Sequence, residues 1–147
     1  MSIEDDVVLL ARVPALNLLG MTALQVLAIG AEQRTYDAGE TLFRAGEMAD
    51  GGFVVRRGSF RVSSDGLKGE TIAGPGTLIG ELALMMEMPR PATATALEYS
   101  SVVRLSRSLY QRVLESHPDA ARRVRDNLAA RTNEAVSSIA RLAPKLI

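Results

Sequence analysis

A short segment near the middle of the chain combines a glycine, a carboxylate and an arginine at a spacing typical of an anion-binding site. Residues 79–84 read IGELAL, and residues 89–91 read PRP. Gly80, just before a turn of helix, lets the backbone approach a ligand closely, and the free N–H groups of that turn attract an anion. Arg90 adds a full charge, and a guanidinium binds phosphate through two parallel hydrogen bonds. The segment therefore predicts a local phosphate site.

The composition indicates one globular domain, residues 1–147, without a strong overall charge. The chain has 147 residues, of which 47% are hydrophobic and 23% charged, and 17 basic residues balance 17 acidic ones. This hydrophobic content argues against disorder, and the zero net charge gives no general attraction for nucleic acid or anionic lipid. Any anion site must therefore be local.

Several chemistries are excluded or disfavoured by the residue types. The chain has no cysteine and a single histidine, His117, so thiolate chemistry is excluded and a histidine-built metal site, such as that of the cupin enzymes, is not expected. No Ser/His/Asp set or pair of carboxylates stands out, and we expect no enzyme activity. No apolar run is long enough to span a membrane, and the N-terminus is acidic rather than basic, which predicts a cytoplasmic protein.

The spacing of apolar residues predicts a mixed fold that is mainly β. Helical periodicity occupies about residues 1–32, and short runs separated by glycines fill about residues 33–105, which indicates an antiparallel β jelly-roll barrel. Asp65-Gly66 predicts a hairpin turn. Two helices follow over residues 106–147, with Ser106 as the N-cap of the first and Pro118 in the first turn of the second.

The last helix carries an apolar stripe that includes Leu128, Ala135 and Leu142. Such a stripe favours packing against the barrel or against a second copy of the chain, which predicts a homodimer through this helix. The helix is also rich in arginine, and we interpret these side chains as a solvated face because the whole chain is neutral. They are Arg122, Arg123, Arg125, Arg131 and Arg141.

Residues 79–93 resemble the phosphate-binding cassette of cyclic-nucleotide-binding domains. This family includes the catabolite activator protein, the regulatory subunits of cyclic-AMP-dependent protein kinase and cyclic-nucleotide-gated channels. Its pattern is roughly Phe/Ile-Gly-Glu-x-Ala-Leu followed by Pro-Arg-x-Ala-Thr. The resemblance extends to the glycines of residues 36–47, the segment 53–60, Gly74-Pro75-Gly76 and the order of helices, barrel and helices.

The resemblance implies a role for individual residues and a cyclic nucleotide as the ligand. Arg90, Leu82, Ala83 and Ala92 would contact the phosphate, while Gly80 and Glu81 would contact the ribose. The predicted base pocket consists of Phe60, Ile72, Ile79 and Leu82. Each also has a structural interpretation: Arg90 as a solvated loop residue, Glu81 as a favourable charge in a first turn of helix, and the apolar residues as core.

Pro91 departs from the family pattern. The residue after the cassette arginine usually donates its N–H to the phosphate, and proline has none to donate. It also lacks the hydroxyl that the family associates with cyclic GMP. We therefore expect weakened binding, with cyclic AMP as the ligand and cyclic GMP as the second candidate. The alternative is a degenerate fold that acts as a protein-interaction or dimerisation module without nucleotide.

The resemblance also implies a regulatory output. In bacteria the family commonly controls transcription through an appended helix-turn-helix domain, for which the chain after residue 106 has no room, so we expect no direct DNA binding. The expected mechanism is a switch in signal transduction: ligand capture moves the C-terminal helices, and an effector protein responds.

Overall fold

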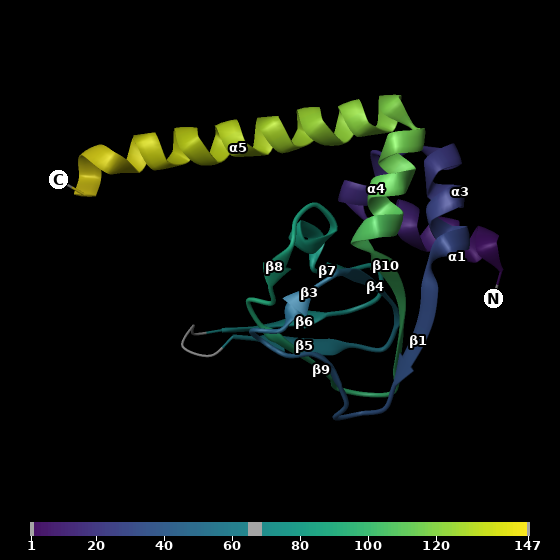
Figure 1. Cartoon of the computed structure of the whole chain (residues 1–147). Coiled ribbons are helices and arrows are strands. Elements are labelled where there is room, and N and C mark those ends of the chain that lie inside the picture. Colours follow the sequence, from purple (N-terminus) through teal and green to yellow (C-terminus); the bar gives the residue numbers. More distant parts are fainter. Residues whose placement is uncertain (1, 65–68, 147) are drawn as a thin grey trace.

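The structure, a computed structural model, describes residues 2–64 and 69–146, with side chains described up to residue 133. Helices lie at both ends of the chain, and the strands lie between them (Figure 1). The predicted turn at Asp65-Gly66 and the stripe positions Ala135 and Leu142, together with Arg141, lie outside the described residues or side chains. No described helix is long and apolar enough to cross a lipid bilayer.

Three N-terminal helices pack against one face of the strands. They are α1 (Ile3–Ala11), α2 (Pro14–Asn17) and α3 (Met21–Gly30). The Ser2 side chain caps α1 by accepting a hydrogen bond from the Asp5 N–H, as expected for a serine before an acidic first turn. Asp6 then forms an ion pair with Arg56, which ties α1 to the sheet below it.

The strands form two four-stranded antiparallel sheets and one short ribbon. The first sheet has the order β1-β10-β4-β7, the second has the order β2-β9-β5-β6, and β3 pairs with β8. Their bounds are β1 Glu32–Tyr36, β2 Thr41–Phe43, β3 Met48–Ala49, β4 Gly51–Arg57, β5 Phe60–Ser63, β6 Glu70–Ala73, β7 Leu78–Ile79, β8 Met88–Pro89, β9 Thr93–Ala96 and β10 Ser100–Ser106. The mixed helical and antiparallel fold agrees with the predicted jelly roll, but the described strands do not close into one barrel.

Two clusters of buried side chains hold the layers together. One lies between the sheets and includes Phe43, Phe53 and Phe60, and the other lies between the first sheet and the helices. Neighbouring strand residues point to opposite faces, so Val102 joins the first cluster while Val103 joins the second. The first sheet is therefore covered on both faces.

The C-terminal helices are α4 (Arg107–Ser116) and α5 (Pro118–Leu146), with a 3₁₀ helix, η1 (Glu81–Leu84), below them. The Ser106 side chain accepts a hydrogen bond from the Leu109 N–H at 3.2 Å, and α5 begins at Pro118, so both predicted helix starts are confirmed. Figure 1 shows α5 starting beside α4 at the helical end of the molecule and extending above the segment between β7 and β8. The start of α5 is anchored by Arg123, whose guanidinium donates to the Leu18 and Leu19 carbonyls at 2.6 and 3.0 Å.

Candidate functional site

The backbone of Arg90 is held by the segment before β3. The Arg90 N–H donates to the Glu47 carbonyl at 2.7 Å, and the Arg90 carbonyl accepts from the Gly46 N–H at 2.8 Å. These two bonds continue the pairing of β8 with β3. The arginine side chain therefore starts from a fixed backbone, whose conformations the flanking prolines also restrict.

The Arg90 side chain is buried against aromatic rings. Its relative exposure is 6%, and its guanidinium carbon lies 4.2 Å from the centre of the Phe43 ring and 5.6 Å from that of Phe53. The alternative of a solvated loop arginine is therefore wrong. No described carboxylate lies within ion-pair distance of the guanidinium, and burial lowers the Arg90 pKa from its ordinary value. A buried cation of this kind is a strong candidate to receive an anion.

Gly80 fits closely against this guanidinium. Its φ angle is 87°, in the left-handed region, and a Cβ at this position would lie 2.5 Å from Arg90 Nη1. The next residues form η1, and the Ala83 N–H already donates to the Gly80 carbonyl at 3.2 Å. The N–H groups of Glu81 and Leu82, in contrast, meet no acceptor among the described residues. The predicted turn of helix is confirmed, although in its tighter 3₁₀ form.

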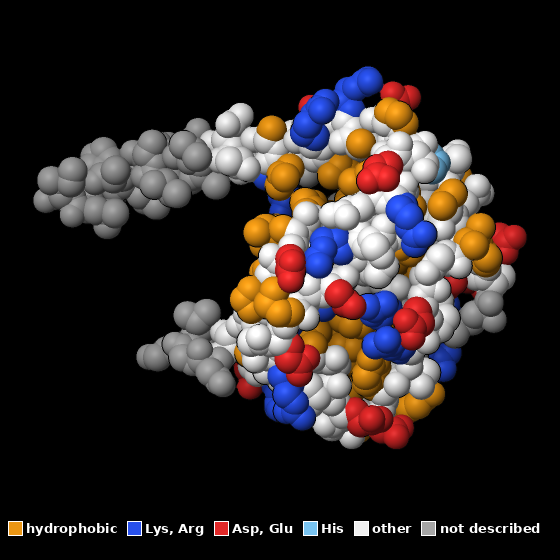
Figure 2. All heavy atoms as spheres, viewed as in Figure 1, with side chains coloured by type: hydrophobic (Ala, Val, Ile, Leu, Met, Phe, Trp, Pro, Cys, Tyr) orange, Lys and Arg blue, Asp and Glu red, His pale blue; other side chains and the backbone are white. Residues whose placement is uncertain are grey.

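A cavity of about 170 Å³ brings most of the predicted cassette residues together. Arg90, Gly80 and Glu81 line it, with Leu82 contributing a side chain that is 50% exposed. The full lining is Ala49, Gly80, Glu81, Leu82, Ala83, Met88, Pro89, Arg90 and Pro91. Figure 2 shows hydrophobic side chains gathered on the surface below α5, and Leu82 and Met86 are among the exposed apolar side chains of the chain.

Four other predicted site residues do not line this cavity. Phe60 and Ile79 belong to the core between the sheets, with exposures of 0% and 7%. Ile72 is 57% exposed on β6, and Ala92 is half-buried in the turn before β9. The cavity therefore unites the predicted phosphate and ribose residues, without Ala92, but contains only Leu82 of the predicted base pocket.

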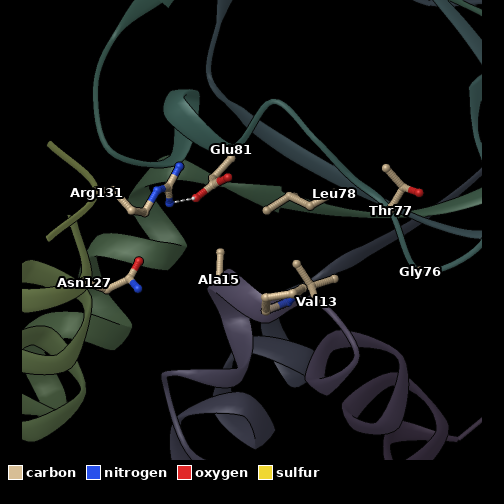
Figure 3. A pocket seen from close by; sticks show the side chains of 9 residues that line it. Val13, Ala15, Gly76, Thr77, Leu78, Glu81, Asn127 and Arg131 are labelled. Atoms are coloured by element: carbon tan, nitrogen blue, oxygen red, sulfur yellow. Dashed lines mark hydrogen bonds and ion pairs between the residues drawn. The ribbon is translucent and has the colours of Figure 1, made fainter. Parts of the chain in front are cut away.

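Glu81 also contacts the last helix. Arg131 of α5 donates from Nη1 to Glu81 Oε1 at 2.7 Å, and both side chains are partly exposed (Figure 3). They close one end of a second pocket of about 480 Å³, whose lining is Val13, Pro14, Ala15, Gly76, Thr77, Leu78, Glu81, Asn127 and Arg131. Arg131 and Arg123 are exposed, as expected for a solvated face, but each also makes a specific contact: Arg131 with Glu81, and Arg123 with the Leu18 carbonyl at the end of α2.

The negative charge of Glu81 affects the pKa of a tyrosine on α4. Tyr110 is buried on α4, and burial, followed by the nearby negative charge of Glu81, raises the pKa of Tyr110 to about 12. Glu81 is thus close enough in space to influence both C-terminal helices. In the described part of the chain, no group of histidine, cysteine or acidic side chains is arranged to hold a metal ion.

Comparison with known proteins shows to which family the chain belongs. The sequence profile of the cyclic nucleotide-binding domain matches residues 33–117, which is more than half of the chain and contains the whole cassette. The chain belongs to the cyclic nucleotide-binding domain family. The resemblance inferred from residues 79–93 is thereby confirmed.

Relatives of this cyclic nucleotide-binding domain occur in regulators and channels. It is 32% identical over 130 residues to a cyclic nucleotide-gated potassium channel of Mesorhizobium japonicum, covering 88% of the chain and 36% of the channel. It is 29% identical over 115 residues to the HTH-type transcriptional regulator Cmr of Mycobacterium tuberculosis, covering 76% of the chain and 47% of the regulator. The chain thus spans less than half the length of these curated relatives.

A solved structure supports the same fold. The N-terminal domain of a transcriptional regulator from Streptomyces coelicolor superposes on this cyclic nucleotide-binding domain with a TM-score of 0.80 at 28% identity. The match covers 89% of this chain and 94% of the other. The fold of most of this chain is therefore also found in a domain of a transcriptional regulator.

Proposed function

We propose that this chain is a sensor module that binds cyclic AMP in the cavity beside Arg90 and responds through its C-terminal helices. The observation that carries the proposal is the guanidinium of Arg90, which is buried among aromatic rings without a carboxylate partner among the described residues. A cyclic nucleotide offers one phosphodiester charge, which matches this cation. The N–H groups of Glu81 and Leu82 provide further donors for the phosphate. The Ala83 N–H already donates to the Gly80 carbonyl, so it would donate to the phosphate and to this carbonyl together.

The ribose fits the carboxylate of Glu81. Glu81 lines the same cavity as Arg90, so a ligand whose phosphate meets Arg90 presents its ribose at this end. A carboxylate accepts a hydrogen bond from the 2′-hydroxyl, and a deoxyribose lacks that donor. The purine would lie against the exposed side chain of Leu82. The other residues of the predicted base pocket, Phe60, Ile72 and Ile79, do not line this cavity, and their contact with the base stays a prediction.

Pro91 sets the expected strength and selectivity of binding. It lines the cavity and has no N–H, so the phosphate loses one donor, at a cost of about 1 kcal/mol or somewhat more. Ala92 is the next residue with an N–H, and its turn would have to shift before this N–H could reach the phosphate. The absence of a hydroxyl at position 91 favours cyclic AMP over cyclic GMP.

The proposed response begins at the contact between Glu81 and Arg131. This contact ties α5 to η1 in the ligand-free molecule. A ribose that forms a hydrogen bond to Glu81 weakens the contact between Glu81 and Arg131, and α5 then moves relative to the strands. An effector protein would respond to the new position of α5, and two copies of the chain would pair through this helix. We place this regulatory module in the cytoplasm and propose no direct contact with DNA and no catalysis.

The second candidate function is an interaction module whose pocket holds no nucleotide, and Pro91 is the observation that favours it. Calorimetric titration of nucleotide-free protein with cyclic AMP, cyclic GMP, 2′-deoxy cyclic AMP and linear 5′-AMP separates the two functions. The sensor predicts saturable heat that is strongest for cyclic AMP and at least about tenfold weaker for the deoxy analogue. The interaction module predicts no saturable heat with any of the four from a folded protein.

A further inference from the structure

Arg107, the first residue of α4, joins three segments around the cassette. Its Nη1 atom lies 3.1 Å from the Ala49 carbonyl of β3, 3.2 Å from the Ala83 carbonyl of η1 and 3.1 Å from the Met86 carbonyl that follows η1. Its own backbone N–H donates to the Asp50 carbonyl at 2.7 Å. One side chain thus contacts the cassette, the ribbon beside it and the start of the C-terminal helices.

The chemistry of this contact suits the end of a short helix. The last carbonyls of a helix have no partner within it and carry a partial negative charge, so a cation placed there is favourable. A guanidinium presents its donors in a fixed plane and stays charged at every ordinary pH. Arg107 therefore holds the C-terminal end of η1, while the opposite end of η1, at Gly80 and Glu81, forms the wall of the cavity.

The backbone of Arg107 is also firmly placed. The side chain of Ser106 caps α4, and the Gly51-to-Arg57 strand pairs with β10 up to Ser106. The Arg107 side chain therefore joins the carbonyls of η1 to a well-supported backbone position at the start of α4. This gives the cassette a direct hydrogen-bonded link to α4.

We propose that Arg107 is the positioning residue that sets η1 for ligand binding and transmits a displacement of η1 to α4. The transmission rests on the proposed function, because it requires a ligand in the cavity, whereas the positioning of η1 does not. The matched control is Arg112 on the same helix, which is exposed and bonds only to the Ser108 carbonyl, at 3.4 Å, among the described residues.

The test is hydrogen–deuterium exchange with mass spectrometry on the whole chain carrying Arg107→Gln or Arg112→Gln, with and without saturating cyclic AMP. Without nucleotide, we expect amides of residues 82–88 to exchange about tenfold faster in Arg107→Gln than in Arg112→Gln, the factor for losing one hydrogen bond to a charged group. When nucleotide is added, we expect amide exchange to change in both η1 and α4 of Arg112→Gln. In Arg107→Gln we expect it to change in η1 alone. Arg107→Lys, which keeps the charge, should restore part of the change in α4 and serves where Arg107→Gln does not fold.

The outcomes separate the two claims. Equal exchange of residues 82–88 in Arg107→Gln and Arg112→Gln without nucleotide overturns the positioning role, whether or not the protein binds a nucleotide. A full nucleotide-induced change in α4 of saturated Arg107→Gln overturns the transmission. If cyclic AMP alters no region of the wild-type protein, the proposed function fails, and the nucleotide-free comparison still decides the positioning role.

Discussion

Arg131 of α5 and Glu81 of η1, which are 50 residues apart in the chain, meet through a hydrogen bond of 2.7 Å. The carboxylate that is expected to bind the ribose therefore already has a cationic partner on the helix that is expected to move. Ligand and helix have to share, or compete for, the same side chain.

This competition predicts tighter nucleotide binding when Arg131 is replaced. Arg131→Gln removes the charge that holds Glu81, so cyclic AMP affinity should rise by about twofold to threefold, a small factor because the pair is exposed. Calorimetric titration measures the change, and Arg122→Gln on the same helix, whose pair with Asp119 lies away from the cassette, is the control. A fall in affinity of tenfold or more would mean instead that Arg131 holds the ligand.

The close fit of Gly80 against Arg90 predicts separate effects on stability and on binding. Gly80→Ala places a Cβ 2.5 Å from Arg90 Nη1 at a φ of 87°. We expect a loss of about 1–2 kcal/mol in unfolding free energy from the backbone alone, together with at least about tenfold weaker cyclic AMP binding because Arg90 is displaced. Urea unfolding and titration measure the two quantities.

Gly39→Ala is the matched control for this substitution, since Gly39 has a φ of 89° and nothing within 4 Å of an added Cβ. It should lose a similar amount of stability and keep its affinity. Equal affinities in the two variants would contradict the role given to the Gly80–Arg90 contact.

Burial of Tyr110 predicts a loss of stability at alkaline pH. Its pKa is raised from 10 to about 12 in the folded protein, so above pH 10 the unfolded chain releases a proton that the folded chain retains. Rising pH therefore favours unfolding, by about 1 kcal/mol between pH 10 and pH 11, and this contribution is constant only below about pH 9.

Urea unfolding of the wild type and Tyr110→Phe at pH 9 and pH 11 isolates this contribution. The wild type should lose about 1.3 kcal/mol more than the variant over that interval. Parallel losses in the two proteins would show that Tyr110 ionises equally easily in both states.

The sequence was sufficient for features that depend on neighbouring residues. Gly80 before η1, Ser106 at the start of α4 and Pro118 at the start of α5 are all where local conformational preferences predicted them. The family resemblance rested on the same local pattern and is confirmed by the profile match. Short-range chemistry determines these features, so a single sequence suffices to find them.

Contacts between distant segments escaped the sequence analysis. Phe43 and Phe53 flank Arg90 because β2 and β4 belong to different sheets that face each other across the core, and their spacing along the chain carries no sign of this. The partners of Arg131 and Arg107 likewise depend on how the helices cross the strands. The predicted jelly-roll barrel is confirmed only in part, since alternation predicts strands but not how they are divided between sheets, and the described strands form two sheets that do not close into a barrel.

The central claim is that the Arg90 guanidinium binds the phosphate of a cyclic nucleotide, and titration of Arg90→Ala with cyclic AMP tests it most directly. Arg61→Ala, which removes an exposed arginine of β5, is the control, and circular dichroism establishes that both variants are folded. The account predicts saturable binding by the wild type and Arg61→Ala and at least about tenfold weaker binding by Arg90→Ala. Undiminished binding by folded Arg90→Ala would contradict it.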